Sequence, residues 1–126
     1  MKSQYIGIDF DGTVVKYKYP EIGEVNPGAI ETLLDLQAAG HKLILITMRS
    51  EDRLAEAVEY LEDKGVKLYS VNENPSQKYW TKSNKIFANY YIDDAAIGVP
   101  LVSDTTGKPF VDWDEVRDLL EVRGLI

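Results

Sequence analysis

Two aspartates at the start of the chain have the types and spacing for carboxylate chemistry. Asp9 and Asp11 follow a short apolar run and are separated by one residue, and Gly12 comes next. Two carboxylates about 4 Å apart repel by roughly 4 kcal/mol at an effective dielectric constant near 20. A hard cation such as Mg²⁺ removes that repulsion and prefers oxygen ligands. The pattern therefore predicts a magnesium-assisted site, although Asp11-Gly12 is also an ordinary turn dipeptide.

Other catalytic side chains are scarce. The 126 residues include no cysteine and one histidine, His41, which follows a glycine between two expected elements and is predicted to lie at the surface. The composition excludes thiol catalysis and disfavours serine–histidine chemistry. A net charge of −7 disfavours nonspecific binding to nucleic acid through a broad basic surface. The sequence shows no signal peptide and no apolar run of membrane-spanning length, so we expect a cytoplasmic protein that does not associate with membranes.

The elements after the aspartates predict a parallel sheet. A helix is expected from Asn26, as N-cap, to Gly40, followed by a buried strand at 43–46. Strand, helix and strand at this spacing form a βαβ unit. Thr47 therefore falls at the carboxyl end of its strand, on the same sheet edge as Asp9, which is the edge where open α/β sheets bind ligands.

The later part of the chain continues this alternation of strands and helices. The segment before the last helix carries turn signals at Asp104 and Thr106-Gly107 and is expected to be a loop. Residues 1–126 should thus form a single three-layer α/β domain, a Rossmann-like, doubly wound and mostly parallel sheet with helices on both faces. The remaining expected elements are a helix at 51–65, an edge strand at 66–71, a strand at 89–92 and a helix capped by Asp112.

The first acidic group also has a family resemblance. Asp9-Phe10-Asp11-Gly12-Thr13-Val14 resembles the D-x-D-G-T-[VL] motif of the haloacid dehalogenase-like (HAD-like) phosphohydrolase superfamily. The resemblance implies that Asp9 is a nucleophile that becomes an aspartyl phosphate and that Asp11 is the general acid and base. Thr47 matches the second motif of the family, in which the hydroxyl group holds a phosphoryl oxygen. Simple capping of the strand end is the alternative for Thr47.

A second acidic pair, Asp93-Asp94, ends the expected strand at 89–92 and resembles the fourth motif of the family. The implied magnesium ligands are Asp9, the backbone carbonyl of Asp11, and Asp93. Asp94 is implied as a partner of these ligands or as a ligand through water.

The third motif of the family is a lysine that neutralises the nucleophile and the phosphate. We assign it to Lys85, because this residue closely precedes the strand that ends in the second acidic pair, with Lys82 as the alternative. Arg49 is a candidate substrate contact, because a guanidinium group suits phosphate and carboxylate groups. A solvent-exposed arginine is the alternative interpretation.

Residues 14–25 resemble the flap of the family, a small hairpin beside the active site. In an extended flap, Lys16 and Lys18 would lie on one face and Tyr17 and Tyr19 on the other. A solvated surface loop is the alternative. No segment is long enough for the cap domain of larger members, so the site should be open or covered by another subunit or partner.

These observations predict a small, capless, HAD-like phosphatase that depends on Mg²⁺ and hydrolyses a phosphomonoester through an aspartyl-phosphate intermediate. The class of the phosphorylated substrate is not identified, nucleic acid is not expected as a partner, and an oligomer is compatible with the sequence. A catalytically idle phosphate- or ligand-binding module on the same fold is the first alternative. A receiver-like signalling domain is the second, and the position of the D-x-D-G-T motif after the first strand disfavours it.

Overall fold

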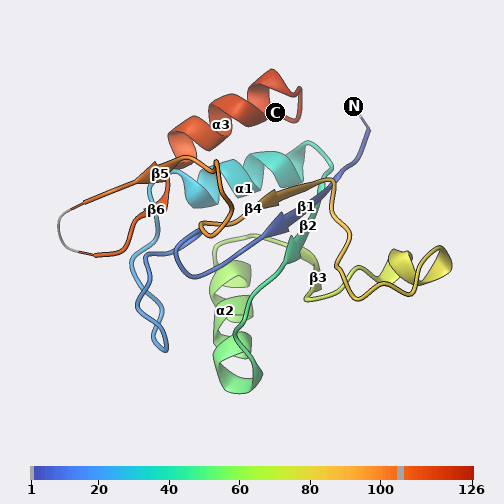
Figure 1. Cartoon of the computed structure of the whole chain (residues 1–126), viewed down its shortest axis with the longest axis horizontal. Coiled ribbons are helices and arrows are strands. Elements are labelled where there is room, and N and C mark those ends of the chain that lie inside the picture. Colours follow the sequence, from blue (N-terminus) through green and yellow to red (C-terminus); the bar gives the residue numbers. More distant parts are fainter. Residues whose placement is uncertain (1, 105–106) are drawn as a thin grey trace.

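A four-stranded parallel sheet forms the centre of the molecule, with the strand order β3-β2-β1-β4 (Figure 1). The structure is a computed structural model and describes residues 2–104 and 107–126. Each connection between parallel neighbours has to cross over, which places helices against the sheet. The strands are β1 (Tyr5–Ile8), β2 (Lys42–Leu45), β3 (Leu68–Val71) and β4 (Tyr90–Ile92).

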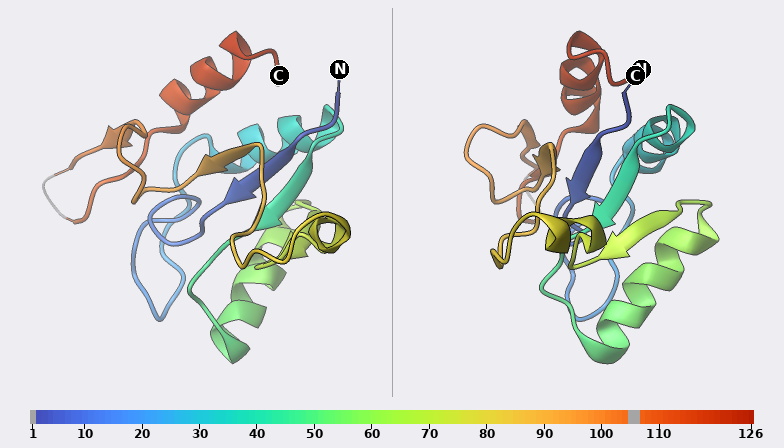
Figure 2. Two further views of the ribbon diagram at one scale, coloured as in Figure 1. Left: turned by 45° about the vertical axis from the view of Figure 1, so that its right-hand side comes forward. Right: turned by 90° about the vertical axis from the view of Figure 1, so that its right-hand side faces the viewer.

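Among the described residues, the three α-helices pack against one face of the sheet. Helices α1 (Ala29–Ala38), α2 (Glu51–Asp63) and α3 (Trp113–Val122) share one apolar core with the residues of β1 and β2 that point to that face (Figures 1 and 2). A short 3-10 helix, η1 (Pro75–Tyr79), lies on the opposite face, where Ser76 Oγ and the hydroxyl of Tyr5 form a hydrogen bond of 2.9 Å. The predicted α/β fold with a parallel sheet is therefore confirmed. The prediction of helices on both faces was wrong for the α-helices, because two successive crossovers in the same direction place α1 and α2 on the same side. In the described part of the chain, no helix combines the length and apolar character that crossing a bilayer requires.

The core lies between the sheet and these helices. The apolar residues of the two central strands are almost fully buried: Ile6, Ile8, Leu43 and Leu45 are each at most 2 % exposed. Burial of an aliphatic side chain of this size contributes about 1.5–3 kcal/mol. Strand β3, whose sequence is half polar, lies at the edge of the sheet as predicted. The continuous apolar runs thus explain which strands are central.

The start of α1 differs from the prediction. The helix begins at Ala29 with Gly28 as its N-cap, and Gly28 has a φ of 83°, a conformation that glycine adopts readily. Asn26 is 1 % exposed and donates from Nδ2 to the carbonyl oxygen of Thr13 at 2.7 Å. The prediction that Asn26 caps the helix was therefore wrong, because its side chain serves the turn after β1 instead.

His41 is not a surface residue, and this prediction was also wrong. It is 5 % exposed and precedes β2, at the amino end of the sheet. Its Nδ1 accepts a hydrogen bond from the backbone N–H of Gln4 at 3.1 Å, so Nε2 is left to donate to the carbonyl oxygen of Leu125 at 2.9 Å. This histidine fastens the end of the chain to the sheet.

The segment before α3 contains a hairpin where a loop was expected. Strands β5 (Leu101–Val102) and β6 (Phe110–Val111) pair antiparallel, with Leu101 opposite Val111. Of the predicted turn residues, Thr106 lies outside the described residues. Each strand has only two residues, which is too short for a clear alternating pattern in the sequence.

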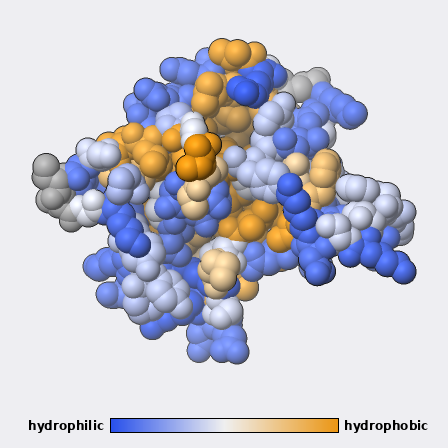
Figure 3. Space-filling view, viewed as in Figure 1, coloured by the Kyte–Doolittle hydropathy of each residue, from blue (hydrophilic) through white to orange (hydrophobic). Residues whose placement is uncertain are grey.

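An apolar groove of about 250 Å³ borders β4 and α3. Figure 3 shows apolar atoms gathered in the middle of the visible face, below α3. The groove includes Ile92, Val99 and Leu119, and the side chain of Ile97 beside it is fully exposed. It is separate from the sheet edge that carries the predicted site residues.

Candidate active site

Three carboxylates converge where β1 and β4 end. The two strands are parallel neighbours with Ile8 opposite Ile92, so the residues that follow them lie side by side. The backbone N–H of Asp9 donates to the carbonyl oxygen of Ile92 at 3.0 Å. One carboxylate oxygen each from Asp9, Asp93 and Asp94 lie within 4.8 Å of one another, and all three residues are half-buried. We call these residues the acidic cluster.

The turn after β1 holds this cluster in place. Thr13 is fully buried; its Oγ1 donates to Asp9 Oδ2 at 2.8 Å and accepts from the backbone N–H of Asp94 at 3.0 Å. Gly12 has a φ of 84°, and a Cβ atom there would clash with the carboxylate of Asp94. The backbone conformation therefore favours glycine at position 12, and any larger residue would also have to displace the carboxylate of Asp94.

The electrostatics of the cluster favour a bound cation. Burial and the hydrogen bond with Asp94 raise the pKa of Asp9 from 3.8 to about 8, although the hydrogen bond from Thr13 lowers it. The negative charges of Asp93 and Asp94 are smaller causes of the same rise in this pKa. Oxygen donors without histidine or cysteine suit a hard cation such as Mg²⁺. The three side chains therefore fit the predicted metal, and Asp94 lies close enough to the other two to be a candidate for direct contact.

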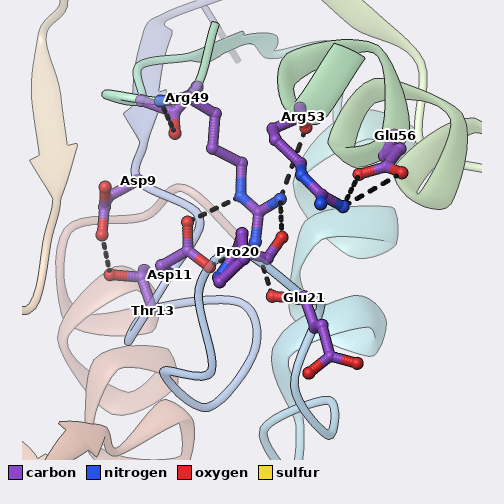
Figure 4. Close-up of polar contacts among 9 residues, drawn as sticks. Asp9, Asp11, Thr13, Pro20, Glu21, Arg49, Arg53 and Glu56 are labelled. Atoms are coloured by element: carbon purple, nitrogen blue, oxygen red, sulfur yellow. Dashed lines mark hydrogen bonds and ion pairs between the residues drawn. The ribbon is translucent and has the colours of Figure 1, made fainter.

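Asp11 does not belong to the cluster, because its carboxylate is bound by Arg49 (Figure 4). Arg49 Nε donates to Oδ2 and Nη2 donates to Oδ1, each at 2.8 Å, which is the bidentate geometry of a strong arginine–carboxylate pair. The hydrogen bonds to Asp11 raise the pKa of Arg49 above its ordinary value, whereas burial lowers it. Arg49 is 2 % exposed, so this pair is largely shielded from water.

The remaining donors of Arg49 bind backbone carbonyl groups. Nη2 donates to Glu21 O at 2.8 Å, and Nη1 donates to Pro20 O at 3.2 Å and to Arg53 O at 3.4 Å (Figure 4). All five N–H groups of the guanidinium therefore have protein acceptors. Arg49 lines a cavity together with Asp9, but in this arrangement its donors connect Asp11 to the flap. Its role as a substrate contact stays a prediction that would require it to release one of these partners.

Thr47 lies at the carboxyl end of β2 and lines the same cavity as Asp9, as the strand-end rule predicted. Its backbone N–H donates to Asn72 Oδ1 at 2.9 Å, and its hydroxyl accepts from the backbone N–H of Arg49 at 3.2 Å. A hydroxyl that accepts one hydrogen bond can still donate its proton to a ligand oxygen. Asn72 was not predicted to belong to the site. Its φ is 53°, a conformation that asparagine tolerates, and the residue type is the only hint that the sequence offers.

Neither predicted motif lysine lines the cavity of the acidic cluster. Lys85 lines a separate cavity, and its Nζ lies 5.7 Å from the ring centroid of Tyr91. Lys82 lines another cavity beside η1. The physical reason is that the chain after η1 returns to the amino end of the sheet, where the backbone N–H of Asn89 donates to Tyr5 O. The assignment of Lys85 to the phosphate site is therefore corrected.

The cavity has a volume of about 540 Å³, within the range for small-molecule sites. From the flap, Tyr17 and Tyr19 line it, whereas Lys16 turns to Glu24 at 3.3 Å. The lysine that does line the cavity is Lys108, which precedes β6. Sequence reasoning missed Lys108, because nothing in its neighbourhood indicates that the hairpin approaches the flap.

Comparison with known proteins finds a structural relative over nearly the whole chain. No protein-family model matches it, and no curated protein matches it significantly. Among solved structures, it is similar to a conserved protein from Bacteroides thetaiotaomicron, with a TM-score of 0.80 and 34 % sequence identity. The similarity covers 97 % of this chain and 93 % of the other. At this identity over nearly the full length of both, the chain belongs to the same family as this conserved Bacteroides thetaiotaomicron protein.

Proposed function

We propose that the protein is a HAD-like phosphatase, which hydrolyses phosphomonoesters with Mg²⁺ through an aspartyl phosphate on Asp9. The observation that carries the proposal is the position of Asp9, half-buried in an acidic cluster at the carboxyl end of β1 and beside a cavity that Thr47 also lines. Perturbed carboxylates in a cavity at this edge of an α/β sheet are typical of functional sites.

Asp9, Asp93 and Asp94 would hold the magnesium ion. A bound Mg²⁺ offsets negative charge where a carboxylate meets a phosphate group. The raised pKa of Asp9 also supports a bound cation. Without a cation, burial and the neighbouring carboxylates disfavour the ionised form of Asp9, which is the form that acts as the nucleophile.

In the proposed reaction, an Asp9 carboxylate oxygen attacks phosphorus in line, and the bond from phosphorus to the leaving-group oxygen breaks. Thr47 donates a hydrogen bond from its hydroxyl group to a phosphoryl oxygen. Asp11, as the acid, gives a proton to the leaving oxygen and then takes one from the water that hydrolyses the aspartyl phosphate. Acid–base assistance of this kind contributes about 10²–10⁴-fold. Asp11 has to leave its pair with Arg49 for this role, because both of its oxygens accept hydrogen bonds there.

The Asp11–Arg49 pair also favours a second candidate function. A carboxylate held by a buried guanidinium group cannot act as an acid, and the protein would then be a phosphate-binding module without turnover. The two candidates share the acidic cluster and differ in whether Asp11 is released from Arg49.

An assay with a panel of phosphate esters tests the proposal. We expect hydrolysis of at least one ester with Mg²⁺, loss of activity in excess chelator, and loss in the Asp9→Asn variant. Asp63→Asn, an exposed aspartate at the end of α2, is the matched control and should retain full activity. Full turnover in chelator contradicts the proposal, and phosphate binding without hydrolysis of any ester favours the binding module.

A further inference from the structure

The flap turns two aromatic rings toward the cavity of the acidic cluster. Tyr17 and Tyr19 line that cavity and are 50 % and 48 % exposed. A single exposed tyrosine needs no explanation. Here, however, two tyrosine rings and the exposed side chain of Met48 line the same cavity as the acidic cluster. The surface suits the uncharged part of a ligand whose charged part faces the acidic cluster.

The ring of Tyr19 rests on a fixed support. Its centroid lies 5.2 Å from the guanidinium carbon of Arg49, and the ring of Phe10 lies at the same distance from that carbon. Arg49 is 2 % exposed and uses all of its N–H groups within the protein. The Arg49 side chain therefore cannot move freely, and it supports Tyr19, which lines the cavity and is 48 % exposed.

Tyr17 is held from another direction. The Nζ atom of Lys108 lies 3.9 Å from its ring centroid, which is close contact for a cation and an aromatic ring. Lys108 belongs to the segment that precedes β6, so this contact joins the flap to the β5–β6 hairpin. The two rings are therefore supported by two different cationic side chains.

The base of the flap is equally constrained. Val15 and Val25 form an antiparallel bridge, and the backbone N–H of Lys16 donates to Glu24 O at 2.8 Å. At Gly23 a Cβ atom would clash with the carbonyl oxygen of Lys16, so the two sides of the flap approach more closely than any side chain allows. A loop that is ordered before binding loses less conformational entropy when a ligand arrives.

We propose that Tyr17 and Tyr19 form a stacking subsite for a flat heteroaromatic ring, so that the substrate is a phosphate ester of the nucleoside class. This inference rests on the phosphatase proposed above and adds the identity of the leaving group. Every base has an aromatic face, so stacking on tyrosine tolerates any base. The phosphate group would face the acidic cluster while the base lies against the flap.

Product binding tests the subsite independently of catalysis. Adenosine and ribose are matched probes that differ by the base, and neither can be hydrolysed by a phosphatase. We expect adenosine, titrated into ¹⁵N-labelled protein and followed by NMR, to shift flap resonances, and ribose to bind at least about tenfold more weakly. Tyr19→Leu, which keeps an apolar side chain, should weaken adenosine binding at least about fivefold, which corresponds to about 1 kcal/mol of stacking. Tyr19→Phe should bind adenosine like the wild type.

The control variant is Tyr79→Ala. This tyrosine is 81 % exposed and also lies beside a lysine, with Lys78 Nζ at 5.3 Å from its ring, but it does not line the cavity. It should bind adenosine like the wild type. Three results would each overturn the subsite: equal binding of ribose and adenosine, no detectable binding of adenosine, or an unchanged affinity for adenosine in Tyr19→Leu.

A kinetic comparison then separates the two proposals. For an active enzyme, kcat/KM for adenosine 5′-monophosphate should exceed that for ribose 5-phosphate, and Tyr19→Leu should reduce the ratio at least about fivefold. Hydrolysis of both esters at the same rate contradicts the subsite but leaves the phosphatase intact. Hydrolysis of neither ester, when another ester of the panel is hydrolysed, contradicts the subsite but not the phosphatase. Hydrolysis of no ester in the panel contradicts the phosphatase, and the adenosine titration still decides whether the rings bind a base.

Discussion

Replacement of Asp9 by asparagine should stabilise the metal-free protein, and the gain should grow with pH. The pKa of Asp9 is raised from 3.8 to about 8 in the folded state. Below about pH 4 the carboxyl is protonated in both states and has no effect. Between about pH 4 and 8 folding takes up a proton, so stability falls as pH rises through this window and is lowest above it. Asparagine carries no charge and avoids this loss.

The size of the pKa shift of Asp9 limits how much Asp9→Asn can stabilise the protein. Within the window, each pH unit lowers the free energy of unfolding of the wild type by at most about 1.4 kcal/mol. The total loss at the top of the window is therefore at most about 6 kcal/mol. The side chain is partly open to water and the other two carboxylates still repel, so we expect about 2–4 kcal/mol. This corresponds to a rise in Tm of about 8–15 °C for a domain of this size. An asparagine side chain at this position can accept from Thr13 as Asp9 Oδ2 does and can donate to Asp94, so the fold is retained.

Thermal unfolding in excess chelator at about pH 5.5 and 8.5, one value inside the window and one above it, measures this effect. Asp63→Asn is the control that should behave like the wild type at both values. Added Mg²⁺ should raise the Tm of the wild type and have little effect on Asp9→Asn. The reasoning is refuted if metal-free Asp9→Asn melts below the metal-free wild type at the higher pH, or if the difference in Tm is the same at both pH values.

Two substitutions test the supports of the site. Arg49→Lys should lower the free energy of unfolding by about 2–4 kcal/mol in urea denaturation, because an ammonium group cannot replace the planar donors that bind Asp11 and the flap; an unchanged midpoint contradicts this role. Trp113→Phe keeps the apolar packing but removes the hydrogen bond from Nε1 to Thr13 O at 2.7 Å, so unfolding in urea should show a loss of about 1–2 kcal/mol. If Trp113→Phe loses no more unfolding free energy than Trp80→Phe, a substitution at an exposed aromatic residue, then this hydrogen bond contributes nothing to stability.

The part of the site that the sequence predicts correctly depends on regular structure. Asp9, Thr47 and Asp93 each follow an apolar strand, and parallel neighbours end at the same sheet edge. That rule needs only strand positions and chain direction, both of which apolar runs and helix signals indicate. The convergence of these residues in one region is therefore predictable from the sequence alone.

The errors about the site concern segments without a repeating pattern. Lys85 lies in an irregular stretch whose path is decided by tertiary contacts, and Lys108 reaches the cavity from a hairpin of two-residue strands. Arg49 and His41 are buried through hydrogen bonds to backbone groups distant in sequence. No local pattern indicates such partners, because they are set by how loops fold back on the sheet.

Two residues that follow β1, Thr13 and Asp9, differ in what they contribute to the stability of the fold. Thr13 joins the site to the rest of the molecule: its hydroxyl binds Asp9 and Asp94, and its carbonyl oxygen accepts from Asn26 Nδ2 and Trp113 Nε1, each at 2.7 Å. Thr13 therefore has a structural reason to be present. Asp9 accepts the hydrogen bond of Thr13, but its raised pKa lowers the stability of the metal-free folded state, so the fold does not need its charge. A residue that destabilises the fold at the edge where α/β sheets bind ligands is best explained by chemistry, and this supports Asp9 as the nucleophile.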